Sequence, residues 1–510
     1  MPSSKPAVVL ALLCLILTTP ARAVWREATS DNFIVYSDGS ESELVSFTQR
    51  VEKFDRVLRI MTGLQQPPAP VKVRIYLVDG ANVVREMDPR HRNLAGLYTS
   101  RLGGGFAIVD RDKARNEYST DGETVLYHEY SHHYMAQYFP SAYPVWYQEG
   151  FAEYFASIKF NKDGVAEIGR PEIPRLPALY NETWLSTRQL MTDTLEDLPE
   201  RDWDRFYAQG WLLTHFLFSS HDRHDQFRQY LTLRSQGVTH DEALQKAFNL
   251  NDEQLGALLR HYFDKGKVVI KRLTSATLMQ EPKVSVRTLT QPEADCLLLT
   301  VRIELGVSDA EKKKLLEQVR AKAQRLAGSE YAQIMLGEAE ARYGDRALAQ
   351  TLFQAQVAST PNNRRAMLDL ATLELQSDQE DHAARLAADR RARSLAAKAN
   401  RLDPNDPEAL YLFYRSFAHE DNGPNQNAID ALAQAYLSLP QCQQYALAQA
   451  RQDLHDGKAD RAVAVLKPIA YSPHGEKYAR QMRAWIQDIE AKKSPALADS
   501  TAEEPSDEKK

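Results

Sequence analysis

The sequence has few cysteines, little net charge and few glycines. Three cysteines in 510 residues exclude a disulfide-dense scaffold, and 22 glycines exclude a collagen-like chain. A formal net charge of −6, from 63 basic and 69 acidic residues, argues against a nucleic-acid-binding protein, which needs a basic surface. Cys296 and Cys442 are the cysteines outside the first 23 residues. They could pair in an oxidising compartment, but their separation and the lack of a shared motif favour two independent buried thiols.

Residues 1–23 have the features of a secretory signal peptide. Lys5 provides a positive charge, an apolar run follows from Ala7 to Leu17, and Ala21-Arg22-Ala23 matches the small-x-small cleavage rule. The run is too short to cross a bilayer, although an uncleaved anchor is the alternative. We therefore expect an exported protein, periplasmic or secreted, with no membrane span after cleavage.

The composition, 43% hydrophobic and 26% charged residues, is typical of a globular protein of roughly two to four domains. The chain changes character along its length, and we expect six parts. They are the signal peptide 1–23, an α/β part 24–118, a helical part 119–270 with a loop-rich stretch, a junction 271–310 with β character from Cys296 to Leu305, helical repeats 311–490 and a disordered tail 491–510.

Three local patterns in the α/β part predict its elements. Apolar residues at helical spacing predict a helix over 41–61, ended by Gly63. Alternation predicts a strand over 71–78. Two β-rich runs on either side of Gly103-Gly104-Gly105 predict a hairpin.

The stretch 311–490 is rich in Ala, Leu, Gln and Arg, and it contains a repeat. Leu336, Gly337, Ala349, Phe353 and Pro361 have the offsets of the tetratricopeptide pattern, in which a helix pair spans 34 residues. The Ala-to-Pro offset recurs from Ala392 to Pro404, from Ala428 to Pro440 and, one residue shorter, from Ala462 to Pro473. The pattern predicts a tetratricopeptide-like solenoid, with an unrelated helical bundle as the alternative.

The sequence Tyr127-His128-Glu129-Tyr130-Ser131-His132 contains an H-E-x-x-H motif. Residues four apart lie on one face of a helix, so His128 and His132 can bind one metal ion, and Glu129 can take a proton from water at that ion. Thr120 to Glu123 fits a capping box, which predicts that the motif lies inside a helix. A surface helix with incidental histidines is the alternative.

A second helical segment, Trp146 to Phe155, follows the motif after a short loop and contains E-G-x-A-x-Y. The two segments together resemble the gluzincin clan of zinc metallopeptidases, the thermolysin and zinc-aminopeptidase type. The resemblance implies that Glu149 is the third zinc ligand, leaving an open position for water. Glu153, one turn further on, can accept the spare N–H of a ligating histidine, or it is a surface carboxylate.

Two more segments match the clan less closely. Tyr207 begins Y-x-x-G, and its counterpart in the aminopeptidase branch donates a hydrogen bond to the oxyanion; a core tyrosine is the alternative. Gly104, Gly105, Phe106 and Ala107 precede the zinc helix, as the substrate-binding edge strand of the clan does, although a plain tight hairpin is equally compatible. The G-x-M-E-N pattern of aminopeptidases is absent there, which favours an endopeptidase. We expect His133 to be structural and His215 to pack in the core.

The sequence therefore predicts an α+β zincin-like metallopeptidase domain followed by an all-α tetratricopeptide-like solenoid. The expected function is hydrolysis of peptide bonds in a peptide or protein substrate, with one Zn²⁺ per chain and with the repeats binding a protein partner or an extended substrate. The alternative is a tetratricopeptide-repeat interaction or scaffold protein whose zincin domain is inactive or structural.

Overall fold

A computed structural model describes residues 24–87, 96–112, 120–161, 163–180, 183–266, 268–377, 381–473 and 476–492. The expected signal peptide 1–23 and residues 493–510 of the expected tail lie outside these ranges. No helix in the described ranges has both the length and the hydropathy needed to cross a bilayer.

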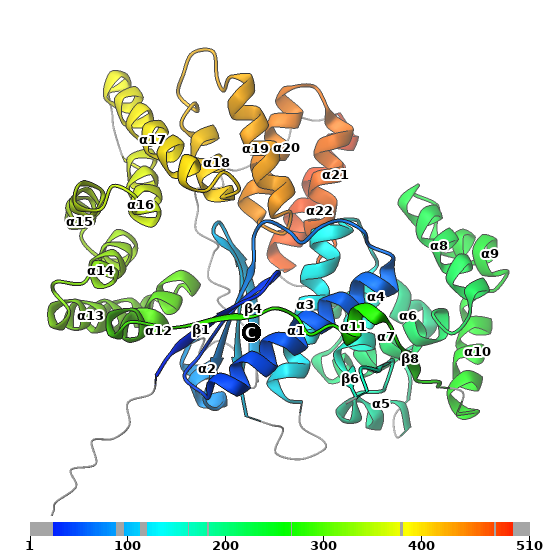
Figure 1. Ribbon diagram of the computed structural model, residues 1–510. Helices are drawn as coiled ribbons and strands as arrows, with labels where there is room; N and C mark the ends of the chain where they lie inside the picture. Colours follow the sequence, from blue (N-terminus) through cyan, green and yellow to red (C-terminus); the bar gives the residue numbers. More distant parts are fainter. Residues whose placement is uncertain are drawn as a thin grey trace, which may run out of the picture.

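A six-stranded mixed sheet forms the centre of the N-terminal half (Figure 1). Its strands are β1 (Arg26–Thr29), β2 (Phe33–Ser37), β3 (Val73–Val78), β4 (Gly96–Arg101), β5 (Gly104–Asp110) and β9 (Ser285–Thr288). The order is β4-β5-β3-β2-β1-β9; β2, β3 and β5 run parallel, and β4 is antiparallel to β5. The predicted hairpin is thus present, with β4 as the terminal strand of the described sheet and β5 inside it.

Helices cover both faces of this sheet. Side chains of α1 (Glu41–Thr62) and α3 (Gly122–Tyr138) share one buried cluster with β2, β3 and β5. Side chains of α2 (Ala81–Met87) and α12 (Gln291–Leu305) share another with the opposite face of β3 and β5. The predicted helix 41–61 is confirmed, and Gly63 ends it in the left-handed conformation at φ 71°.

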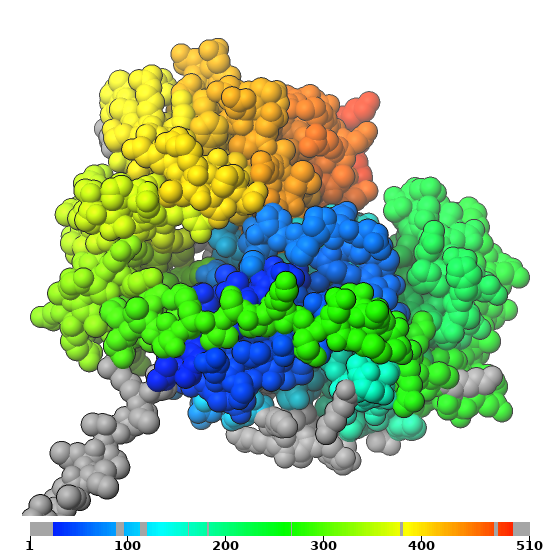
Figure 2. All heavy atoms as spheres, in the orientation of Figure 1, coloured from blue at the N-terminus to red at the C-terminus, as the bar shows by residue number. Residues whose placement is uncertain are grey.

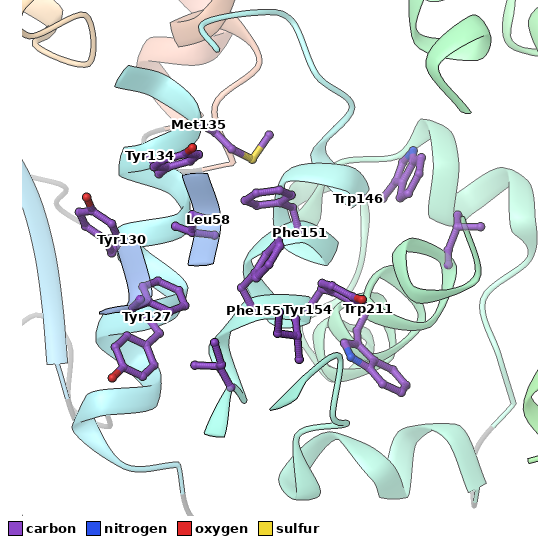
Figure 3. Close-up of a cluster of buried hydrophobic side chains, with 14 of the residues drawn as sticks. Leu58, Tyr127, Tyr130, Tyr134, Met135, Trp146, Phe151, Tyr154, Phe155 and Trp211 are labelled. Carbon is purple, nitrogen blue, oxygen red and sulfur yellow. The ribbon is translucent and has the colours of Figure 1, made fainter. Parts of the chain in front are cut away.

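The metal-motif helix α3 belongs to a helical layer beside the sheet. Its other helices are α4 (Val145–Ala156), α5 (Leu176–Tyr180), α6 (Thr187–Thr192), α7 (Trp203–Leu217), α8 (His221–Ser235), α9 (His240–Phe248) and α10 (Asp252–Asp264). Between them lie the short 3₁₀ helices η1 (Ile173–Arg175), η2 (Leu195–Asp197) and η3 (Glu200–Asp202), and a small sheet of β6 (Lys159–Phe160), β7 (Ala166–Ile168) and β8 (Lys271–Leu273). Figure 3 shows Phe151 and Phe155 of α4 between that helix and α3, in the same cluster as Tyr130. This aromatic core fixes α3 against α4.

The predicted β character from Cys296 to Leu305 is wrong, because this stretch lies in α12. A continuous apolar run fits a buried strand or a buried helix equally well by periodicity. Here Thr290 and Glu293 form a capping box that starts a helix. Val301 faces the sheet, whereas Ile303 packs against the helices that follow. The chain before α12, including α11 (Ala276–Met279) and β9, crosses the N-terminal half as a green band in Figure 2.

The C-terminal half is entirely helical in its described residues, and its helices form an arc beside the sheet (Figure 1). They are α13 (Asp309–Arg325), α14 (Glu330–Tyr343), α15 (Arg346–Ser359), α16 (Arg364–Leu375), α17 (His382–Leu402), α18 (Pro407–Arg415), α19 (Gln426–Ser438), α20 (Gln443–His455), α21 (Ala459–Ala470) and α22 (Glu476–Glu490). The repeat alanines Ala349, Ala392, Ala428 and Ala462 lie on α15, α17, α19 and α21, and each is fully buried. The prediction of successive helix pairs is confirmed.

Cys296 and Cys442 are two separate buried thiols that do not form a disulfide in the described structure, as predicted. Cys296 packs between α12 and the first helices of the repeats, and Cys442 packs between α18 and α20. Each behaves as a small apolar side chain in a separate cluster.

The N-terminal cap of α3 differs from the predicted one by a residue. Asp121 is the capping residue, and its side chain accepts a hydrogen bond from the backbone N–H of Thr124 at 2.8 Å. Thr120 is exposed and precedes the cap. Glu123 instead pairs with Arg50 of α1 at 2.7 Å, which joins the metal-motif helix to α1.

Replacement of Asp121 by alanine should destabilise the protein, because it removes an N-terminal cap from α3. We expect a loss of about 1 kcal/mol in the free energy of unfolding, measured by urea denaturation. Thr120→Ala is the matched control and should leave stability unchanged. Equal effects of the two variants would contradict the assignment of the cap.

Candidate metal centre

Three predicted ligands meet where α3 and α4 pack together. His128 Nε2 lies 3.2 Å from His132 Nε2 and 3.2 Å from Glu149 Oε2, and His132 Nε2 lies 3.5 Å from the same oxygen. The two imidazoles come from successive turns of α3, and the carboxylate comes from the second turn of α4. The three ligand atoms therefore form a nearly equilateral triangle.

This triangle has the size of one face of a metal tetrahedron. Metal–ligand distances of 2.0–2.1 Å place the corners of a tetrahedron about 3.3–3.4 Å apart. Glu149 is fully buried, and within the described chain its carboxylate has no hydrogen-bond donor of good geometry. A buried carboxylate without donors is costly unless a cation faces it. The residues present therefore fit a divalent ion with a fourth corner left for another ligand.

The charges around the triangle are coupled. Burial acts to lower the pKa of His128. The contacts of His128 with Glu149 and Glu153 outweigh the effect of burial and raise the pKa of His128 to about 9. Burial acts to raise the pKa of Glu149, yet the imidazoles of His132 and His128 hold it well below its usual range. Without a metal, both shifts favour a proton on imidazole beside an ionised carboxylate. Metal binding must release that proton, because imidazole binds metals only in its neutral form.

Glu153 lies beside His128. One of its oxygens is 3.5 Å from His128 Nδ1, the ring nitrogen that does not face Glu149, and the side chain is buried. The same oxygen lies 3.2 Å from Arg175 Nη2. Glu153 can therefore orient the ring of His128 while Arg175 compensates its charge.

Tyr207 lies beside the same group. Its ring centroid is 6.2 Å from that of His128, and the guanidinium of Arg175 lies over the phenol ring at 4.4 Å. Burial, together with the charges of Glu149 and Glu153, raises the pKa of Tyr207 well above its ordinary value. The phenol therefore keeps its proton and can donate a hydrogen bond.

Tyr207 reaches this position because α7 packs very closely against α4. A Cβ atom added to Gly150 would lie 2.3 Å from Thr214 Oγ1 and 2.4 Å from the carbonyl oxygen of Gly210. Only glycine at position 150 allows this crossing. The glycines of the E-G and Y-x-x-G motifs thus bring together the helices that carry Glu149 and Tyr207.

Glu129 is half-buried on α3, next to His128. Its negative charge contributes to the raised pKa values of His128 and Tyr207. It therefore lies close enough to the group to act on it electrostatically.

The prediction that Gly104, Gly105, Phe106 and Ala107 form a substrate-binding edge strand is wrong. They lie on β5, where the backbone of Phe106 and Ala107 pairs with β3 on one side and β4 on the other. Gly104 has φ 119°, and a Cβ there would lie 2.8 Å from Val71. A Cβ on Gly105 would lie 2.4 Å from the hydroxyl of Tyr98. The glycines serve close packing, and β4 is the terminal strand of the described sheet.

The other histidines near the motif are structural. His133 is buried, and its Nδ1 lies 2.6 Å from the hydroxyl oxygen of Tyr98 and 3.0 Å from the side-chain amide nitrogen of Gln441. His215 is buried in α7 and contacts Tyr262 at 2.9 Å. Both predictions are confirmed.

A second group of possible ligands, His240, Asp241 and Asp252, lies between α9 and α10. Arg188 pairs with both carboxylates, and His240 Nε2 lies 2.8 Å from Asp252 Oδ1. The guanidinium takes the place that a cation would need, so this group is an ion-pair network.

The sequence analysis did not identify two residues of the loop-rich stretch that lie near the site. Arg175 links Glu153 and Tyr207, as described. Burial and the charges of Glu153 and Asp121 raise the pKa of Glu172 to about 7. Neither residue belongs to a motif, and the proline-rich sequence around them gave no sign that it folds back over α4.

Comparisons with known proteins were made for the whole chain. No family model matches it, and no curated protein matches it. Among solved structures, it is similar to a thermophilic TPR protein of Thermus thermophilus, with 19% identity and a TM-score of 0.33, over 38% of this chain and 99% of that one. The function of the chain must therefore be inferred from the geometry of the site.

Gly150→Ala should separate α4 from α7. Because the added methyl group meets Thr214 and the backbone of Gly210, we expect a loss of about 1–3 kcal/mol in the free energy of unfolding, together with weaker metal binding. Denaturant unfolding and metal analysis after dialysis measure the two effects. Gly328→Ala is the control, because no heavy atom lies within 4 Å of the added Cβ. Wild-type stability of the Gly150 variant would contradict the tight crossing.

Proposed function

We propose that this chain is a zinc-dependent peptidase of the gluzincin type that its motifs resemble. The observation that carries the proposal is the triangle of His128, His132 and Glu149, whose edges of 3.2, 3.2 and 3.5 Å match one face of a tetrahedral site. Two imidazoles and one carboxylate are a donor set typical of catalytic zinc.

The residues around the triangle have the properties that peptide hydrolysis needs. Zn²⁺ bound there would supply a Lewis acid that lowers the pKa of water toward neutrality. Glu129 accepts a proton from the attacking water and later delivers it to the leaving amine. Tyr207, whose phenol stays protonated, donates a hydrogen bond to the developing oxyanion. Glu153 holds His128 in its ligating orientation.

The sheet supports an extended peptide as the proposed substrate. β4 is the terminal strand of the described sheet, and it lies beside α3: Tyr98 of β4 contacts His133 at 2.6 Å. An extended peptide can pair with such an edge by strand addition. Since the aminopeptidase pattern is absent, we propose an endopeptidase acting on extended peptides or unfolded proteins, in the periplasm or outside the cell.

A second candidate function is protein binding by the tetratricopeptide-like repeats, with the metal site serving a structural role. The repeats expose several large apolar side chains, which suits a binding surface: Tyr331, Leu348, Leu402, Leu437 and Tyr471. A structural zinc site is normally closed by four protein ligands, whereas the described triangle offers three. The catalytic candidate is therefore favoured.

Glu129→Gln separates the two candidates. We expect wild type to contain about one zinc per chain and to cleave casein or a peptide library. The Glu129→Gln protein should keep the metal and lose turnover by several orders of magnitude, because its amide cannot accept the proton. Glu253→Gln, on the exposed first turn of α10, is the control and should retain full activity. Wild type without zinc, or unchanged turnover of Glu129→Gln, would refute the mechanism.

Tyr207→Phe tests the oxyanion donor. The variant keeps the ring under Arg175 and removes only the hydroxyl group, so folding and zinc content should be unchanged. We expect kcat/KM to fall about a hundredfold or more, with most of the loss in kcat. Tyr180→Phe, at an exposed position, should be neutral. A loss confined to KM would assign Tyr207 to substrate binding instead.

A further inference from the structure

The inner side of the repeats holds a segment of the N-terminal half. Leu102 at the tip of the β4–β5 hairpin and Val71 just before β3 pack against the cluster formed by α18, α19 and α20. The hydroxyl of Tyr445 in α20 donates a hydrogen bond to the carbonyl oxygen of Leu102. The space beside Gly103 at this tip is bounded by Glu408 of α18, 3.6 Å from where a Cβ would lie. This part of the repeat surface is therefore filled by the chain itself.

A second contact joins the repeats to the metal-motif helix. The side-chain amide nitrogen of Gln441, just before α20, lies 3.0 Å from His133 Nδ1, and the hydroxyl oxygen of Tyr98 in β4 lies 2.6 Å from the same nitrogen. One imidazole on α3 thus connects β4 with the repeats. Gly105 makes this possible, because any side chain there would displace the Tyr98 hydroxyl.

The last repeat helices also reach α4 and the loops near it. Gln148 of α4 donates to the carbonyl oxygen of Tyr471, after α21, at 2.5 Å. Arg480 of α22 lies 3.3 Å from Glu196. The C-terminal repeats therefore contact α3 and α4, which carry the three candidate ligands, and the hairpin that contains β4.

We propose that the C-terminal repeats, α18–α21, are a positioning arm that holds the edge strand β4 against α3. Gln441 and Tyr445 are its positioning residues, since they act through His133 and the hairpin backbone and do not touch the metal ligands. The occupant of this repeat surface is the chain's own hairpin. This positioning has a consequence for catalysis, which rests on the proposed function: the arm places a peptide paired with β4 in front of the triangle of metal ligands.

The test uses the full chain carrying Gln441→Leu and Tyr445→Phe together. Tyr414→Phe is the matched control, because its hydroxyl bonds Gln452 at 3.0 Å inside the repeats. In the double variant we expect the β4 amides that pair with β5 to exchange hydrogen about tenfold faster, as loss of two hydrogen bonds allows. Zinc content and exchange in α14–α16 should stay at wild-type values. Unchanged exchange in β4, or the same increase in Tyr414→Phe, would overturn the positioning arm.

Kinetics separate this inference from the proposed function. With a peptide substrate, we expect the double variant to raise KM severalfold at nearly constant kcat, because the strand that binds substrate has loosened while the metal group has not. Faster exchange in β4 with unchanged KM would overturn its role in substrate binding. Faster exchange in β4 together with no turnover by wild type would refute the peptidase proposal and support the arm alone.

Discussion

A carboxylate that is fully buried, as that of Glu149 is, must face cations or donors, and this requirement shapes the site. The imidazoles of α3 supply part of the compensation, with His128 Nε2 at 3.2 Å. They can do so only if α3 and α4 lie close together, which the aromatic core between them ensures (Figure 3). The crossing of α4 and α7 at Gly150 then brings Tyr207 to the same place. The need to compensate the buried carboxylate and the close packing of α4 against α3 and α7 thus define the site.

The sequence predicted this group well, because its signals are local. His128 and His132 are four residues apart on one helix, so their shared face follows from helix geometry alone. Glu149 and Tyr207 came from a resemblance in residue order, and both lie beside the two histidines. The helix pairs of the repeats were also predictable, since their small buried alanines recur at one offset from a proline in three copies and one residue nearer to it in the fourth.

The predictions that failed depend on contacts between distant segments. The position of β5 inside the sheet follows from strand order, which no local pattern of Gly104 to Ala107 contains. The apolar run before Leu305 fits a strand or a helix by periodicity, and as the helix that the Thr290–Glu293 capping box begins it is buried against both the sheet and the repeats. Arg175 meets Glu153 and Tyr207 through a loop fold that its own sequence does not specify.

Contacts between distant segments also restrict how the repeats can move relative to the sheet. At one end, α12 packs on the sheet with Val301 and on the first repeat helices with Ile303. Near the other end, Tyr445 and Gln441 hold the hairpin and α3. An arc fixed at two separated places cannot swing as a tethered domain does, because any rotation about one attachment strains the other. A ligand that binds the repeats near α20 must therefore either displace the hairpin or transmit its effect to β4, which makes the repeats part of the site's framework.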